Sequence, residues 1–323
     1  MAEGHETSAF PRYLWWNGKR TPWAEATTHV TVIGWSSVSA IFEGIMAYWN
    51  HDEQELFVFR LDAHLRRFLR SQKMVRMTQD YTAAQLTDAI TDLLQANDAR
   101  EDTYIMPLAF IGGGGGFRRL TATDPAPTDI TITARPSSSH LLKREWKHAC
   151  VSSWTRIPDN VMPPRIKNLS NYRNSQLASA EASINGYDTA ILLNTAGKVA
   201  EGPGACLLMV RDGILYTPGV TDSILESITR ESIITLARDL GIEVVERPVD
   251  RTELYIADEV FFCGTAAEIT PIVSVDRYPV GDGEQGPITS RLEGAFHDIV
   301  RGKDRRYAHW VTPAAAAVGV PAD

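Results

Sequence analysis

The residue types best suited to chemistry lie near the middle of the chain. Lys167 stands in an irregular stretch bounded by prolines and asparagines, Tyr172 follows it, and Glu201 enters a glycine-rich turn further on. A lysine amine can act as a nucleophile and carry a proton, and a carboxylate can pair with a cation. Taken singly, such a lysine is more often a solvated surface residue, so the pattern alone does not name a reaction.

Other segments occur in a specific order and give these residues a context. They are residues 38–49 (VSAIFEGIMAYW), 59–77 (FRLDAHLRRFLRSQKMVRM), 151–154 (VSSW), 225–230 (LESITR), 257–260 (ADEV) and 264–271 (GTAAEITP). Each is weak by itself. Together with Lys167, Tyr172 and Glu201 they resemble the motifs of the class IV aminotransferases, in particular the branched-chain amino acid aminotransferases, over nearly the whole chain.

The resemblance implies fold type IV, an α/β (α+β) architecture of two α/β domains with pyridoxal 5'-phosphate at the domain interface. A chain of 323 residues also exceeds what one hydrophobic core commonly fills. We expect a smaller N-terminal domain over 1–136, a linker over 137–143, a larger C-terminal domain with the lysine over 144–312, and a flexible alanine-rich tail over 313–323.

The resemblance also assigns roles to the central residues. Lys167 resembles the lysine that forms a Schiff base with the cofactor and moves a proton to and from the substrate α-carbon. Glu201 resembles the carboxylate that pairs with the pyridine nitrogen, and Tyr172 the phenol that donates to the cofactor's O3′. Leu225 would pack against the ring, although a leucine there is equally an ordinary core residue.

The cofactor's phosphate needs cationic and backbone donors. Arg60 matches the family's phosphate arginine, although it is one of many arginines around a helix. Ile228 and Thr229 stand at the start of a predicted helix, where unpaired N–H groups and the helix dipole favour an anion. Thr265 would add a hydroxyl.

The substrate-binding residues implied by the resemblance are Phe42, Tyr104, Met106, Thr265, Ala266 and Ala267. The backbone N–H groups of the 265–267 turn are expected to bind a carboxylate as a nest.

Departures from the family pattern concern the substrate. Met46 and Met106 occupy positions where relatives acting on α-amino acids often carry arginine, Ser37 replaces a tyrosine, and Cys206 an asparagine. These changes predict a less polar, wider pocket, because a carboxylate buried without a partner is costly. The alternative is that both methionines pack the core, or that Arg135 supplies the charge from another direction.

The expected function is transfer of an amino group between a hydrophobic, branched-chain-like L-amino acid and a 2-oxo acid such as 2-oxoglutarate or pyruvate, in a ping-pong cycle. Three alternatives remain open at this point. The same cofactor would serve an (R)-selective amine transaminase or an aminodeoxychorismate lyase, and a degenerate homologue would act only as a binding protein.

The composition argues against several classes of binding partner. A net charge of −8 at pH 7 argues against nucleic acid or an anionic membrane, and no apolar run approaches bilayer length. The three cysteines fit no metal-ligand or disulfide spacing, and the N-terminus lacks the pattern of a signal peptide. We therefore expect a cytoplasmic protein without a metal, with a small-molecule amino donor and a 2-oxo acid as partners. The resemblance implies a homodimer.

The elements that position these residues follow from local patterns. Asn17-Gly18 predicts a hairpin turn, and apolar spacing predicts helices over 61–77, with Leu65, Phe68, Leu69 and Met74 on one side, and over 82–96. Residues 104–111 are expected to form a strand that ends at a glycine run over 112–116. The second half predicts a meandering sheet with strands over 190–193, 206–210 and 214–216, then a helix capped by Ser227 and stopped by Gly241.

Overall fold

The computed structural model describes residues 10–112 and 128–314 and divides into two compact units. The first contains the described residues up to Ser138 and those from Ile299 onward, and the second is Ser139–Asp298. The expected boundary near 137–143 lies at this division. Residues 299–312, which we expected in the second domain, belong to the first unit instead, because their strand pairs with the first unit's sheet.

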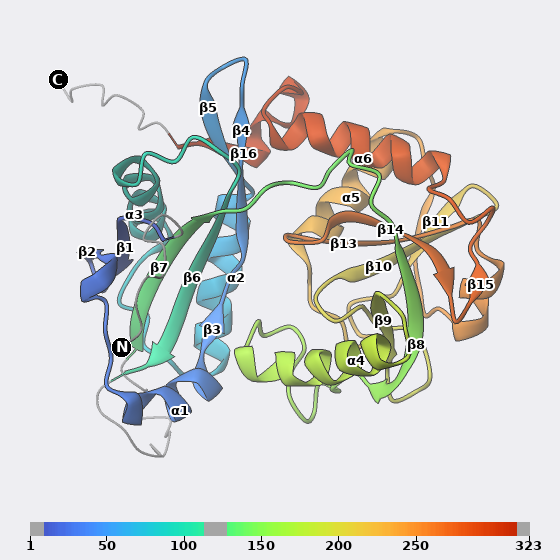
Figure 1. Cartoon of the computed structure of the whole chain (residues 1–323), viewed down its shortest axis with the longest axis horizontal. Coiled ribbons are helices and arrows are strands. Elements are labelled where there is room, and N and C mark those ends of the chain that lie inside the picture. Colours follow the sequence, from blue (N-terminus) through green and yellow to red (C-terminus); the bar gives the residue numbers. More distant parts are fainter. Residues whose placement is uncertain (1–9, 113–127, 315–323) are drawn as a thin grey trace, which may run out of the picture. The chain divides into compact units, whose positions relative to one another are not determined.

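The first unit is built on an eight-stranded antiparallel sheet (Figure 1). The strands are β1 (Tyr13–Trp16), β2 (Lys19–Pro22), β3 (Ile41–Phe42), β4 (Ile45–Asn50), β5 (Glu55–Phe59), β6 (Thr103–Ile111), β7 (Thr128–Pro136) and β16 (Val311–Pro313). Their order is β16-β5-β4-β6-β7-β1-β2, with β3 paired to β6. The predicted turn between β1 and β2 is confirmed, since Asn17 and Gly18 have φ of 44° and 86°.

Helices accompany this sheet, and two of them, α2 and α3, are amphipathic. The helical elements of the first unit are η1 (Trp23–Glu25), α1 (Val30–Ser39), α2 (Leu61–Met74), α3 (Ala83–Ala96) and η4 (Arg305–Trp310). Helix α2 buries Leu65 and Phe68 as predicted, but it ends at Met74, which is 46% exposed and not part of the packed side. Thr82 begins α3 with a capping box.

The C-terminal strand corrects the expected tail. Val311–Pro313 forms β16 and pairs antiparallel with β5, and the Ala314 N–H donates to the Leu56 carbonyl oxygen at 2.8 Å. Strand β7 extends to Pro136, the last residue of the expected N-terminal domain. Residues 315–323, and the part of the glycine run beyond Gly112, lie outside the described residues.

The second unit holds another eight-stranded sheet, but it is mixed rather than a meander. Its strands are β8 (Lys147–Thr155), β9 (Thr189–Leu193), β10 (Cys206–Arg211), β11 (Ile214–Thr217), β12 (Val244–Glu246), β13 (Glu259–Gly264), β14 (Glu268–Val275) and β15 (Tyr278–Pro279). The order is β12-β11-β10-β13-β14-β8-β9, with β15 paired to β14. Pairs β8/β9, β14/β8 and β11/β12 are parallel, because helices connect two of these pairs as crossovers.

The helices of this part of the chain are η2 (Leu169–Asn171), α4 (Tyr172–Ile184), α5 (Ile228–Asp239), η3 (Arg251–Ile256) and α6 (Pro287–Val300). Helix α4 packs along β8 and β9, as Figure 1 shows. The predicted limits of α5 are confirmed: the Ser227 side chain accepts from the Arg230 N–H, and Gly241, at φ 76°, follows the last turn. Leu207, Met209, Val260 and Phe262 form the centre of the core.

Candidate functional site

The segment that carries Lys167 is irregular and is held by side-chain amides. It leaves the end of β8, and the Asn171 amide nitrogen donates to the carbonyl oxygens of Pro163 and Ile166 at 3.2 and 3.3 Å. Half-buried Lys167 places Nζ 2.7 Å from the Tyr172 hydroxyl oxygen. The structure thus brings together the two residues that the sequence assigned to one site.

Glu201 is buried, with 4% of the residue exposed, and its carboxylate is occupied on both oxygens. One oxygen lies 2.7 Å from the Arg156 guanidinium, and the other accepts from the Leu225 backbone N–H at 3.1 Å. Cys206 Sγ lies 3.7 Å from that second oxygen. The carboxylate therefore fixes the start of the Leu225 segment, and the guanidinium balances its charge.

Arg156 is a residue that sequence reasoning missed. It is 7% exposed, and its Nε and Nη1 atoms are buried without a hydrogen-bond partner among the described residues. An isolated buried cation would be very costly, so the ion pair with Glu201 is what makes this position tolerable. The sequence gives little signal, because an arginine after a strand is indistinguishable from a surface residue.

Two glycines allow a close approach of the backbone around this carboxylate. A Cβ on Gly202 would lie 2.7 Å from the Phe262 ring, and one on Gly264 would lie 3.3 Å from the Gly204 carbonyl oxygen. The turn after Glu201 therefore contacts the end of β13. Gly264 pairs with Glu268, so the predicted carboxylate-binding residues Thr265, Ala266 and Ala267 form the tip of the β13–β14 hairpin beside it.

The N-terminus of α5 offers backbone donors. The Ser227 hydroxyl accepts from the Arg230 N–H at 3.2 Å, which satisfies one of the four N–H groups that a helix leaves without partners. Ile228 and Thr229, the first two helical residues, are 5% and 3% exposed. Their N–H groups precede the first intrahelical bond and can serve an anion.

Arg60 lies in the first unit at the start of α2. Its backbone is left-handed, with φ of 50°, and its N–H donates to the Trp310 carbonyl oxygen at 2.6 Å. The guanidinium lies 5.1 Å from the centre of the Trp310 ring. The C-terminal segment that we assigned to the second domain therefore positions this arginine.

The first-unit candidates for substrate binding share one face of the sheet. In the sheet, Met46 is the cross-strand neighbour of Tyr104, and Phe42 is that of Leu108. Tyr104, Met106 and Leu108 are alternate residues of β6. Directly paired and alternate residues point to the same side of a sheet. The Tyr104 hydroxyl packs on Gly44, where a Cβ would lie 2.0 Å from its oxygen.

Arg135, the alternative source of positive charge, pairs with Tyr104 and thus projects from the same face. It is exposed, and its guanidinium stacks 4.6 Å from the Trp23 ring centre and 5.5 Å from that of Phe10. Ser37 lies exposed on α1.

A buried charge cluster ties β3 to α2. Glu43 is fully buried and accepts from Arg67 Nε and Nη2, both at 2.7 Å, while His64 Nδ1 lies 2.8 Å from the carboxylate. Burial opposes ionisation, but the contacts with Arg67 and His64 outweigh it and lower the pKa of Glu43 to about 2.

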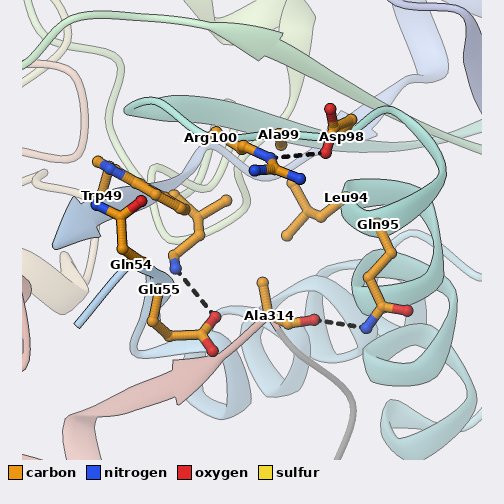
Figure 2. A pocket seen from close by; sticks show the side chains of 10 residues that line it. Trp49, Gln54, Glu55, Leu94, Gln95, Asp98, Ala99, Arg100 and Ala314 are labelled. Atoms are coloured by element: carbon orange, nitrogen blue, oxygen red, sulfur yellow. Dashed lines mark hydrogen bonds and ion pairs between the residues drawn. The ribbon is translucent and has the colours of Figure 1, made fainter. Parts of the chain in front are cut away.

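A cavity of about 360 Å³ in the first unit contains none of the candidate residues. Figure 2 shows that Gln95 bonds to the Ala314 carbonyl oxygen and that Arg100 pairs with Asp98, so polar groups around it already have partners. Because its lining includes neither Lys167 nor Glu201 nor any other candidate site residue, we assign it no part in the reaction.

Three further findings concern only the described residues. They contain no cluster of three or more His, Cys, Asp or Glu that could hold a metal ion. Within the same ranges no helix is long and apolar enough to span a bilayer. Cys150, Cys206 and Cys263 are buried free thiols.

Known proteins resemble this chain closely. The family model described as amino-transferase class IV matches residues 40–275. A probable branched-chain-amino-acid aminotransferase of Aquifex aeolicus is 41% identical over 306 residues, 93% of this chain and 96% of that protein. The solved structure of the branched-chain amino acid aminotransferase from Thermobaculum terrenum in its PLP-form has a TM-score of 0.91 at 52% identity and covers 95% of this chain and 99% of that one.

A second solved structure was determined together with an amino acid. It is the branched-chain aminotransferase from the thermophilic archaeon Thermoproteus uzoniensis with norvaline. Its TM-score is 0.87 at 40% identity, covering 94% of this chain and 99% of that one.

Proposed function

Since this chain belongs to the class IV aminotransferases, we propose that it is a pyridoxal-phosphate-dependent transaminase that exchanges an amino group between a hydrophobic, branched-chain-like L-amino acid and a 2-oxo acid. The observation that carries the proposal is the pairing of the Lys167 amine with the Tyr172 phenol at 2.7 Å, in the same unit as the buried carboxylate of Glu201.

The donor set fits the cofactor. A lysine amine suits an aldehyde, a carboxylate suits a pyridinium nitrogen, and the first N–H groups of α5 suit a phosphate. An ionised carboxylate offers about four acceptor positions. Arg156, Leu225 and Cys206 account for three around Glu201, which leaves room for the pyridine N–H. Arg60, from the first unit, remains a proposed phosphate ligand.

Each residue then has a defined task. When bound, pyridoxal 5'-phosphate supplies an electron sink that makes the substrate α-carbon acidic. Lys167 anchors the cofactor covalently and moves the proton at that carbon, and Tyr172 Oη holds the amine at a fixed position between these roles. Glu201 supplies the negative charge for the ring nitrogen.

The proposed substrates follow from the relatives and from the 265–267 turn. The relatives from Aquifex aeolicus and Thermobaculum terrenum act, by their names, on branched-chain amino acids, and the Thermoproteus uzoniensis structure holds norvaline, a hydrophobic amino acid. We place the substrate carboxylate on the backbone N–H groups of the turn and propose 2-oxoglutarate or pyruvate as the acceptor. Phe42, Met46, Tyr104 and Met106 would face the apolar side chain.

One observation favours a second candidate, an (R)-selective amine transaminase. Met46 and Met106 lie on the same sheet face and carry no charge, so no buried cation would be left unpaired by a substrate without a carboxylate. The same residues would serve aminodeoxychorismate lyase chemistry, which differs in the fate of the substrate. The contacts of Lys167 and Glu201 argue against a binding protein without activity.

Two expectations stay predictions. Homodimer formation rests on the resemblance, and a cytoplasmic location on the buried free cysteines and the bacterial relatives.

A screen of amino donors tests the proposal. The cofactor-loaded enzyme is mixed with hydrophobic L-amino acids, L-glutamate, and both enantiomers of 1-phenylethylamine, and the visible absorbance of the cofactor is followed. We expect leucine-like donors to bleach it. Bleaching by the (R)-amine as well as by the amino acids would support the wider pocket. If every donor needs a carboxylate, and if this requirement disappears in Arg135→Ala, the result would support the alternative, in which Arg135 supplies the positive charge. No bleaching by any donor would contradict transaminase activity.

A further inference from the structure

The tip of the β13–β14 hairpin has an unusual backbone. Thr265, Ala266 and Ala267 form a three-residue loop, a type that commonly places the next residue in the left-handed region and prefers glycine there. Here that residue is Glu268, with φ of 44°. A side chain in this region costs on the order of 1 kcal/mol. The loop conformation therefore depends on contacts that hold Glu268.

His140, in the connection that precedes β8, makes these contacts. Its backbone N–H donates to a Glu268 carboxylate oxygen at 2.7 Å, and its ring Nδ1 lies 3.0 Å from the same oxygen. Its Nε2 lies 2.8 Å from the Ala267 carbonyl oxygen. One residue thus bridges the side chain and the backbone at the end of the loop, and Glu268 is 2% exposed.

The partners of the ring define its proton content. The Thr270 hydroxyl lies 2.6 Å from the Ala267 carbonyl, to which it must donate, so it presents a lone pair to Nε2 at 3.3 Å. Nε2 therefore faces two acceptors and Nδ1 faces a carboxylate. A neutral imidazole has a single N–H and would direct a lone pair at one of these acceptors. Only the imidazolium satisfies both sides.

The electrostatic setting agrees with the geometry. The hydrogen bond to Glu268 raises the pKa of His140, against the opposing effect of burial, and Glu145 adds to the increase. Burial opposes ionisation of Glu268, but hydrogen bonds from His140 and Ser139 bring its pKa below the ordinary value. Glu268 and Glu145 are the charged groups that act on this ring.

We propose that the His140 imidazolium is a positioning residue that holds the 265–267 turn in the conformation that receives a substrate carboxylate. The inference rests on the proposed function, because it assigns that turn to the carboxylate. The contacts in the folded protein favour protonation of His140. The turn is therefore fully held at low pH, and this support is lost as the pH rises through the folded-state pKa of His140. Affinity for carboxylate ligands should fall in the same range, whereas affinity for neutral ligands should not.

Calorimetry with a matched pair of non-reacting ligands tests this on the cofactor-loaded enzyme. The carboxylate 4-methylpentanoate stays ionised from about pH 6 to 9, and its amide is neutral throughout. We expect the dissociation constant of the carboxylate to rise about tenfold with pH, the size of one charge-assisted hydrogen bond, and that of the amide to stay constant. His140→Gln should bind the carboxylate weakly at every pH and the amide normally.

His148→Gln is the matched control, because His148 is exposed and bonds Ser274 at the other end of β14. It should reproduce the wild-type profile. A carboxylate affinity that ignores pH in the wild type, or an equal loss of amide binding in His140→Gln, would overturn the inference. The wild-type profile decides this even if the variant does not fold. If the protein forms no covalent link with the cofactor, the proposed function itself is refuted. The visible spectrum of the enzyme, recorded before the calorimetry, distinguishes this outcome.

Discussion

At the scale of single residues, the ion pair of Arg156 and Glu201 is the feature on which the site most depends. Both side chains are buried, at 8% and 6% exposure, and the two charges lie 2.7 Å apart. Such a pair is stable as a unit, but removal of one partner leaves a buried charge that costs about 3–5 kcal/mol. In the proposed function, the same contact orients the carboxylate that we assign to the ring nitrogen of the cofactor.

Arg156→Met should therefore lower the free energy of unfolding by about 3 kcal/mol, because Glu201 is left without its cation. Adding Glu201→Gln should restore most of that loss, since no lone charge then remains. Urea unfolding of the four proteins measures the coupling. Arg173→Met, which removes an exposed arginine bonded to Gln176, is the control and should change little. Additive effects of the two substitutions would argue against the pair.

Residue identities were predictable here only through the combined motifs. Lys167, Tyr172 and Glu201 fall in segments whose order is specific, and the structure places Lys167 beside Tyr172. Arg156 was not predicted, because its partner lies far along the chain and no local sequence pattern shows that an arginine is buried. His140 was not predicted for the same reason, since its acceptors all come from a hairpin over a hundred residues away.

At the scale of elements, the N-terminus of α5 has two roles: its cap stabilises the helix, and its first turn forms the proposed phosphate site. Ser227→Ala removes the cap from Arg230 N–H and should cost about 1 kcal/mol of stability. It should also weaken cofactor binding, because the first turn of the helix becomes less ordered. Thr82→Ala is the matched control: it removes the cap of α3, which holds no proposed ligand.

Equilibrium dialysis with pyridoxal 5'-phosphate, beside thermal unfolding of the apoprotein, separates the two effects. Both variants should lose similar stability, and only Ser227→Ala should lose cofactor affinity. Equal affinities in the two variants would count against a phosphate at α5.

The cluster of Glu43, His64 and Arg67 holds the β3–β4 corner on α2. The folded-state pKa of Glu43, about 2, lies below the ordinary glutamate value of about 4.3. Its contribution to stability is therefore present above the ordinary value and lost as the pH falls toward 2. Arg67→Met should destabilise the protein at neutral pH and flatten this acid-induced loss.

Urea midpoints between about pH 2 and 7 measure both effects. Arg66→Met, the neighbouring arginine in an exposed pair with Asp62, should match the wild type. An unchanged acid profile in Arg67→Met would mean that the ion pair does not set the pKa of Glu43.

Helices were more predictable than sheets because their signals are local. The apolar residues of α3 and of α5 recur at helical spacing, and each helix has its capping residue, Thr82 or Ser227, directly before its first turn. The second sheet was expected as a meander, yet β8, β9 and β14 run parallel. Which strands become neighbours depends on long-range packing, and strand runs in the sequence do not record it.

At the scale of the whole molecule, the chain's end corrects the predicted division. The described residues 299–314 join the first unit, where β16 extends its sheet and Trp310 contacts Arg60. A short polar segment with one tryptophan carries no local sign of this. The consequence is functional, because a proposed phosphate ligand is supported by the last residues of the fold.

The central claim is that Lys167 carries the cofactor of a class IV aminotransferase. Borohydride reduction of the loaded enzyme, followed by peptide mapping, identifies the lysine that holds pyridoxal 5'-phosphate. We predict that the label lies on the peptide containing Lys167, and that Lys167→Ala folds but is neither labelled nor active. Label on a different lysine, such as the exposed Lys198 paired with Asp250, or full turnover by Lys167→Ala, would contradict the account.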